Sequence, residues 1–295
     1  MKCAIFVSGP IRYCDEVILQ IRSLFEKYSD NITFEFFIHL WISDDSNKAR
    51  RDESSIQDVL NLLPNIRSLT FEQPLNSVNL NSKYGSWTDT HSDFSSIVGM
   101  FVAINKLISV LKKQDDYEEY THILRLRTDC CFLIKDGLLD NIDFKSNKVY
   151  LADNPLISNE WVSDHIMFTK KEKFFSVWEY KSLSKFIKTF SKHARNPEFY
   201  LKTKIPKNDR VLKWKRYLDY HIVYRPNKNT DPVVLNNILD AHGVKYLFDY
   251  SLNKFQFSEL LNYIKEIEAK YANHYSFKNK LIRMMKIILN NKKAY

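Results

Sequence analysis

Short apolar segments alternate with longer amphipathic ones along the first half of the chain, and this alternation constrains the fold most strongly. Strands are expected at 2–8, 32–40, 66–71 and 120–132, where aliphatic and aromatic residues cluster. Apolar residues at helical spacing predict helices between them, at 15–28, 56–63 and 92–113. Because strand–helix–strand repeats return each strand in the same direction, we expect an α/β fold with a mostly parallel central sheet flanked by helices.

The second half of the chain has a mixed pattern. Strands are expected at 148–151 and 164–168, a helix at 171–190 and an edge strand near 217–225. No low-complexity linker separates the halves of the 295-residue chain. We therefore predict a catalytic domain at 1–250, followed by a helical, basic C-terminal extension at 251–295.

The glycine content excludes two common nucleotide-binding classes. Only 5 glycines occur, and neither G-x-G-x-x-G nor G-x-x-x-x-G-K-[ST] is present. Dinucleotide-dependent oxidoreductases and P-loop NTPases are therefore disfavoured. The net charge of +9 favours anionic partners, a group that includes nucleotides, lipid headgroups and nucleic acids.

Cysteine spacing and hydropathy suggest a reducing compartment. The 4 cysteines include no C-x-x-C pair, so neither a zinc ribbon nor a disulfide framework is indicated. The apolar run at 3–7 is shorter than a signal peptide requires, and no apolar run reaches the ~18 residues that span a bilayer. We expect a cytoplasmic location.

The segment 120–132 ends its apolar run in Arg127-Thr128-Asp129. Ligands of open α/β sheets bind outside the carboxyl ends of the strands, so a carboxylate at this position is well placed for chemistry. Asp129 could hold a metal–diphosphate pair or orient a sugar hydroxyl. An ion pair that only closes the strand is the alternative.

The loops after the first and second expected strands should lie beside the 127–129 segment. Ser8-Gly9-Pro10-Ile11-Arg12 follows the first strand, and its arginine suits a phosphate. Taken alone, this segment favours the alternative, a Gly-Pro turn with a surface arginine. His39 and Trp41 end the second strand, where Trp41 could stack on a base or a sugar. A core histidine beside a packing tryptophan is the alternative.

A fourth loop carries three groups suited to proton transfer. Glu160, Asp164 and His165 lie beside Trp161, just before an apolar strand. A carboxylate near an aromatic ring is typical of a sugar acceptor site with a general base. Solvated acidic residues at a loop end are the alternative.

Several of these segments, in this order, resemble the bacterial lipopolysaccharide- and capsule-synthesis glycosyltransferases related to the WavE family. The matching segments are Ile5-Phe6-Val7-Ser8-Gly9-Pro10-Ile11-Arg12, His39-Leu40-Trp41, Ser96-Ile97-Val98-Gly99-Met100-Phe101, Leu124-Arg125-Leu126-Arg127-Thr128-Asp129 and Ser163-Asp164-His165-Ile166-Met167-Phe168. A weaker match is Pro197-Glu198, followed by a strand that ends at Arg225.

The resemblance implies a GT-A-type (Rossmann-like) glycosyltransferase with a nucleotide-sugar donor and a surface glycan, lipid-linked or free, as acceptor. Asp129 then takes the place of the acidic motif that binds the donor phosphates through a divalent metal, Mn²⁺ or Mg²⁺. Arg127 departs from the usual two-acid pattern and leaves metal dependence open. The donor-binding residues implied are Ser8, Gly9, Pro10, Arg12, His39, Trp41, Arg127 and Asp129.

For the acceptor side, Asp164 is the first candidate for the catalytic base of an inverting enzyme. Glu160 is the second candidate, and His165 completes the catalytic set.

The C-terminal segment 277–293 has an apolar helical face and a basic one. Such a helix can lie on an anionic membrane surface, which suits a lipid-carried acceptor. A terminal helix docked on the core is the alternative.

Two other function classes fit parts of the sequence. A sugar nucleotidyltransferase can share this sheet topology, but Ser8-Gly9-Pro10-Ile11-Arg12 is short for its phosphate-binding loop. A non-catalytic membrane- or nucleic-acid-binding module would explain the charge of +9. No nucleic-acid-binding motif is visible, so we expect no nucleic-acid partner.

Overall fold

The computed structural model describes residues 1–10, 14–42, 61, 65–84, 94–132, 137–153, 162–192, 196–215 and 219–222. The helix expected at 56–63 and the extension at 251–295, with its amphipathic segment 277–293, lie outside these ranges. Arg12 and Glu160 also lie outside them. The proposed division at residue 250 therefore stays a prediction.

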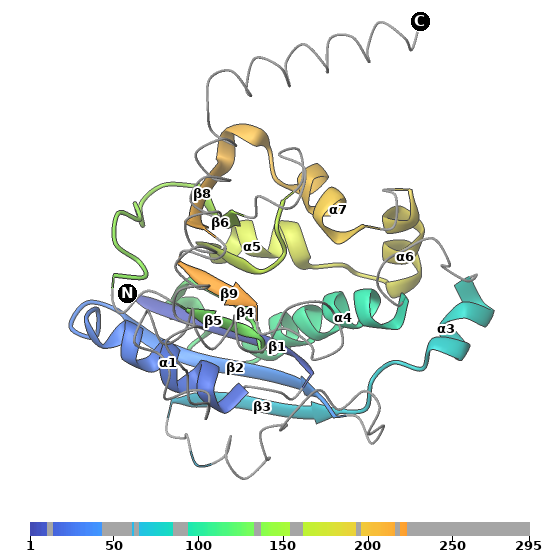
Figure 1. Cartoon of the computed structure of the whole chain (residues 1–295), viewed down its shortest axis with the longest axis horizontal. Helices are drawn as coiled ribbons and strands as arrows, with labels where there is room; N and C mark the ends of the chain where they lie inside the picture. The colour runs from blue at the N-terminus through green and yellow to red at the C-terminus, as the bar shows by residue number, and fades with distance from the viewer. Residues whose placement is uncertain are drawn as a thin grey trace, which may run out of the picture.

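A seven-stranded sheet forms the centre of the described chain, in the order β3-β2-β1-β4-β7-β6-β8 (Figure 1). Its strands are β1 (Lys2–Pro10), β2 (Thr33–Trp41), β3 (Ile66–Glu72), β4 (Tyr120–Arg127), β6 (Val149–Asp153), β7 (Ile166–Lys170) and β8 (Arg210–Lys215). Strands β3, β2, β1 and β4 are parallel, and so are β6 and β8, while β7 runs antiparallel to both its neighbours. The expected mostly parallel α/β sheet is confirmed.

Helices cover both faces of this sheet, as the pattern predicted. They are α1 (Cys14–Glu26), α3 (Ser77–Tyr84), α4 (Phe94–Leu111), α5 (Lys171–Trp178), α6 (Leu183–Ser191) and α7 (Pro197–Lys204), with short 3₁₀ turns η1 (Tyr117–Glu119) and η2 (Lys207–Asp209). Helix α1 packs on one face, and α4 to α7 share a core with the other. No helix of the described ranges combines the length and the apolar character that crossing a bilayer requires.

The two faces have separate apolar cores because side chains alternate along each strand. In β1, Cys3, Ile5 and Val7 join the core under α1, whereas Ala4 and Phe6 join the other. Burial of both faces explains why β1 is a continuous apolar run. Each large side chain buried in this way contributes about 1.5–3 kcal/mol.

The helix expected at 171–190 is two helices. Glu179, which caps the end of α5, is extended, and Ser182 starts α6 from an extended conformation with φ −147°. The backbone N–H of Tyr180 donates to the side chain of Asn105 in α4 at 3.1 Å. The break lets Phe186 and Phe190 of α6 pack on Phe101, with ring centroids 4.7 and 5.5 Å away.

The strand expected at 120–132 is also interrupted. β4 ends at Arg127, Thr128 and Asp129 form a turn, and β5 (Cys130–Phe132) pairs antiparallel with β9 (Tyr220–Ile222). The strand expected near 217–225 is thus not an edge of the main sheet, since β8 occupies that edge. Figure 1 shows the β5–β9 pair beside α1, where the N–H of Phe132 donates to the Gln20 side chain at 2.8 Å.

Candidate functional site

Polar residues of three neighbouring strands lie in one row at the carboxyl edge of the sheet. Ser8 of β1 is in register with His39 of β2 on one side and Arg127 of β4 on the other. β1 and β4 are adjacent although the chain visits β2 and β3 between them, so the strand order reverses here. Ligands of open α/β sheets bind at such a reversal, outside the carboxyl ends of the strands. Asp164 and His165 immediately precede the antiparallel β7 and lie at the same edge, because Ile166 pairs with Leu126 of β4.

Arg127 and Asp129 form a forked ion pair across the turn after β4. The Arg127 Nε and Nη2 atoms lie 2.8 and 3.0 Å from the two carboxylate oxygens of Asp129. Asp129 is buried, while the Arg127 side chain is 32% exposed. Burial alone would lower the pKa of Arg127, but the contact with Asp129 more than offsets it and raises that pKa. The exposed guanidinium is therefore a fixed positive charge at the edge.

Asp164 is a buried carboxylate surrounded by cationic partners. Its oxygens lie 3.6 Å from Arg127 Nη1, 3.9 Å from Arg125 Nη2 and 3.8 Å from His165 Nε2. Burial favours the neutral acid, yet the positive neighbours, Arg127 foremost, hold the pKa of Asp164 below its usual value. Asp164 is therefore ionised throughout the neutral range.

Arg125 is the most unusual residue of the edge. Its side chain is fully buried and lies over the Trp178 ring at 4.9 Å. None of its three guanidinium nitrogens has a hydrogen-bond partner among the described residues. Burial lowers its pKa to about 10, against the opposing effect of Asp164. A buried charge without hydrogen bonds is costly, so this guanidinium marks a place suited to an anionic group.

Two buried hydroxyl groups nearby also lack hydrogen-bond partners among the described residues. The side-chain oxygens of Ser8 and Thr128 are buried and lack hydrogen-bond partners within the part of the chain that the structure describes. Gly9 joins these two residues in space: it has φ +149°, and a Cβ atom there would lie 2.6 Å from the Thr128 hydroxyl oxygen. The carboxyl end of β1 and the turn after β4 thus touch, and only glycine fits at position 9.

Glu198 is a further carboxyl group of this edge, which the sequence analysis did not assign. It lies in the first turn of α7, and its carbonyl oxygen accepts the N–H of Val162 at 3.1 Å. Burial first, and then the negative charge of Asp164, raise its pKa from 4.5 to about 7. Pro197-Glu198 was visible in the sequence as a short match, but its proximity to Asp164, 34 positions away in the chain, was not.

His165 is tied to the same cluster. Its Nδ1 atom lies 2.9 Å from the Tyr220 hydroxyl oxygen, so the β5–β9 pair orients the ring toward Asp164. His39 and Trp41 are buried as well. His39 Nε2 contacts Glu72 Oε2 at 3.1 Å, and Trp41 packs against Gly99 of α4. Both contacts suit the core interpretation, and donor binding by His39 and Trp41 stays a prediction.

The described residues of this edge do not form a site that fits a divalent metal ion. Within the described ranges, no three histidine, cysteine, aspartate or glutamate side chains come together as a metal site. Both oxygens of Asp129 take N–H groups of Arg127, and Asp164 has a second arginine beside it. Mg²⁺ and Mn²⁺ prefer clustered oxygen ligands without adjacent cations. The predicted metal role of Asp129 has no support in this geometry.

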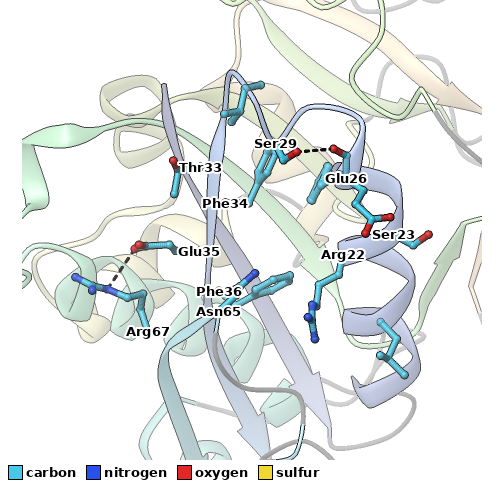
Figure 2. A pocket seen from close by; sticks show the side chains of 13 residues that line it. Arg22, Ser23, Glu26, Ser29, Thr33, Phe34, Glu35, Phe36, Asn65 and Arg67 are labelled. Atoms are coloured by element: carbon cyan, nitrogen blue, oxygen red, sulfur yellow. Dashed lines mark hydrogen bonds and ion pairs between the residues drawn. The ribbon is translucent and has the colours of Figure 1, made fainter.

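A hollow of about 660 Å³ lies elsewhere, at the amino ends of β2 and β3 beside α1 (Figure 2). Two of its charged groups are paired: Arg67 Nε lies 3.2 Å from Glu35, and Arg67 Nη2 also lies 2.9 Å from Asp116. None of the carboxyl-edge residues lines it. The chemistry therefore gathers at the opposite edge of the sheet.

No protein-family model matches the sequence, and no curated protein matches it significantly. Solved structures with a similar chain arrangement include the galactosyltransferase LgtC with donor and acceptor sugar analogues, at 12% identity, 71% coverage of this chain and 72% of that chain, and a TM-score of 0.39. S. aureus TarS is 12% identical, and the match covers 95% of this chain and 45% of that chain with a TM-score of 0.42. A mutant of Drosophila β1,4-galactosyltransferase 7, in complex with manganese, UDP-Gal and xylobiose, is 11% identical. That match covers 78% of this chain and 76% of that chain with a TM-score of 0.33. Likeness at this level does not by itself identify an activity, a donor or an acceptor.

Proposed function

We propose that the protein is a glycosyltransferase that moves a sugar from a nucleotide-sugar donor to a growing surface glycan, of the lipopolysaccharide or capsule type. One observation carries the proposal. At the strand reversal, an exposed cation and a buried one lie beside two carboxyl groups whose pKa values are shifted in opposite directions. Such a pair of carboxyl groups is typical of a site that divides charge stabilisation and proton transfer between two residues.

The cationic half of the edge suits the leaving group. When the bond between the anomeric carbon and the diphosphate oxygen breaks, the bonding electrons leave with the nucleotide and add negative charge. Arg127 is the accessible guanidinium, and Arg125 adds positive charge behind it. Preorganised charge of this kind lowers the barrier most where water is excluded.

The carboxyl half suits the acceptor. As the acceptor oxygen bonds to the anomeric carbon, its hydroxyl proton must pass to a base. Glu198 fits this role, since a group with a pKa of about 7 is a stronger base than an ordinary carboxylate and is still ionised in a useful fraction at neutral pH. Asp164 supplies the fixed negative charge that raises this pKa. The earlier assignment of Asp164 as base remains the alternative.

The acceptor class and the location are parts of the same proposal. The motif resemblance supports a lipopolysaccharide or capsule acceptor, and a lipid-carried acceptor suits an enzyme on the cytoplasmic face of a membrane. The buried thiols of Cys3 and Cys130, both unbridged, are compatible with a reducing compartment.

The first test is a thermal-shift screen of UDP, GDP, CMP and dTDP compounds against the full chain. A ligand that binds the folded state raises the melting temperature according to its affinity. We expect one nucleotide class to shift it clearly, and the matching nucleotide sugar to release free nucleotide when an oligosaccharide acceptor is added. Release of pyrophosphate instead would identify a nucleotidyltransferase, and no shift with any nucleotide would overturn the proposal.

A further inference from the structure

The pairing of Arg127 with Asp129 suggests how the donor is bound, given the function proposed above. We propose that Arg127 contacts the donor's diphosphate directly and that Asp129 is its positioning residue, so that binding needs no divalent metal ion. In this assignment the arginine is the ligand-binding group, and the aspartate holds it. The motif resemblance implies the opposite, with Asp129 binding the donor phosphates through a metal ion.

The geometry of the pair supports this assignment. Asp129 occupies the Nε and Nη2 side of the guanidinium at 2.8 and 3.0 Å, and the side chain of Arg127 is still 32% exposed. The remaining nitrogen, Nη1, lies 3.6 Å from an oxygen of Asp164, which is beyond hydrogen-bond range, so its N–H groups can still donate to a phosphate. Asp129 is buried, so its carboxylate is shielded from an incoming ligand.

The surrounding charges also support direct binding of the diphosphate by Arg127. Arg125 lies fully buried behind the edge, within 3.9 Å of Asp164, and lacks hydrogen bonds to any described residue. A diphosphate brings about two negative charges, and Arg127 offers it charge-assisted N–H donors. Arg125 adds positive charge behind the edge, where Asp129 and Asp164 balance part of the charge of the two arginines. The hydroxyls of Ser8 and Thr128, also without partners in the described ranges, add donors of the kind that phosphate oxygens accept.

Electrostatics also disfavour a metal at this place. A divalent cation bound to Asp129 would lie close to Arg127, whose nitrogens are 2.8–3.0 Å from the carboxylate oxygens. Like charges at that range repel strongly in a buried setting. Metal binding would first have to displace the arginine from a pair that is forked and charge-assisted.

The test measures nucleoside diphosphate binding by calorimetry with the full chain, once in EDTA and once with Mn²⁺. We expect the nucleotide class found in the screen to bind in EDTA, with Mn²⁺ changing the dissociation constant by less than about threefold. Binding that requires Mn²⁺ would overturn this inference and leave the proposed function intact. Absence of binding under both conditions would overturn both.

Variants separate the roles of the two residues. Arg127→Met should weaken binding in EDTA by at least about tenfold, which corresponds to about 1.4 kcal/mol, and added methylguanidinium should restore part of it. Asp129→Asn, which keeps one acceptor for Arg127, should weaken binding less. Arg67→Met removes an arginine at the opposite edge and is the matched control, with binding unchanged. A greater loss for Asp129→Asn than for Arg127→Met would contradict the assignment, and the wild-type metal comparison decides the matter if either variant fails to fold.

Discussion

Charged residues are arranged differently at the two edges of the sheet. At the amino edge, Lys2 contacts Glu35 and Asp116, and Arg67 contacts the same two carboxylates, so each charge has an opposite partner. The Tyr120 hydroxyl also donates to Glu35. At the carboxyl edge, Arg125 is fully buried without a hydrogen bond to the described residues. The first arrangement connects the ends of β1, β2, β3 and β4. In the second, Asp164 lies 3.9 Å from Arg125, yet the N–H donors of Arg125 have no acceptor among the described residues.

The difference indicates how structural charges can be told from functional ones. Exposed ion pairs contribute little each and are easily satisfied by one another or by water. A buried cation that lacks its hydrogen bonds costs stability, and a site can retain it when the charge acts on a ligand. The hollow beside α1 is a depression of about 660 Å³, yet the unsatisfied groups lie at the other edge.

The largest effect is expected when the proposed base, Glu198, is replaced, since this tests whether the carboxyl edge is functional. Glu198→Gln keeps the shape of the side chain but cannot accept a proton, so we expect transfer to fall about 10²–10⁴-fold while nucleotide binding stays unchanged. Steady-state kinetics and calorimetry on the same preparation would check both. Equal loss of activity in the surface control Glu172→Gln, or near-normal activity in Glu198→Gln, would remove Glu198 from the mechanism.

Replacing the buried cation should separate stability from activity. Arg125→Met keeps the bulk against Trp178 and removes a desolvated charge, while Asp164 keeps Arg127 and His165 as partners. We expect the free energy of unfolding to rise by about 1–3 kcal/mol and transfer activity to fall. Urea unfolding measures the first quantity. A loss of stability above about 2 kcal/mol would mean that Arg125 is a structural residue.

The raised pKa of Glu198 predicts how stability depends on pH. Between pH 4.5 and about 7 the folded chain holds a proton on Glu198 that the unfolded chain has released. The contribution of Glu198 to stability is therefore full below pH 4.5 and falls as pH rises to about 7. Glu198→Gln should match the wild type near pH 4.5 and be more stable at pH 8, as measured by urea unfolding. A constant difference across this range would contradict the assignment.

The smallest effect is expected at the amino edge. Arg67→Met should lower the free energy of unfolding by about 0–1 kcal/mol, because its partners Glu35 and Asp116 keep Lys2 and the side chain is 39% exposed. The loss should shrink in 1 M salt, where surface charges are screened. A larger, salt-insensitive loss would show that this edge resembles the other.

The sequence predicted the strands that are buried on both faces. β1, β2 and β4 are rich in apolar residues. The polar residues at their carboxyl ends placed Ser8, His39 and Arg127 at one edge. The turn at Thr128 and Asp129 has no glycine or proline, so the change from β4 to β5 left no local mark. β8 carries Lys213 and Lys215 within six residues and was missed because edge strands tolerate charge. Glu198 was missed because its environment depends on tertiary contacts.

The hydrogen bond between His165 and Tyr220 joins residues that are 55 positions apart in the chain. During synthesis, His165 leaves the ribosome well before its partner exists, and at about 5–20 residues per second the interval is about 3–11 s. Until β9 pairs with β5, the ring beside Asp164 lacks this orienting contact. The proposed site therefore matures later than the parallel strands that carry it, so a nascent chain can form these strands before the residues proposed for transfer are all in place.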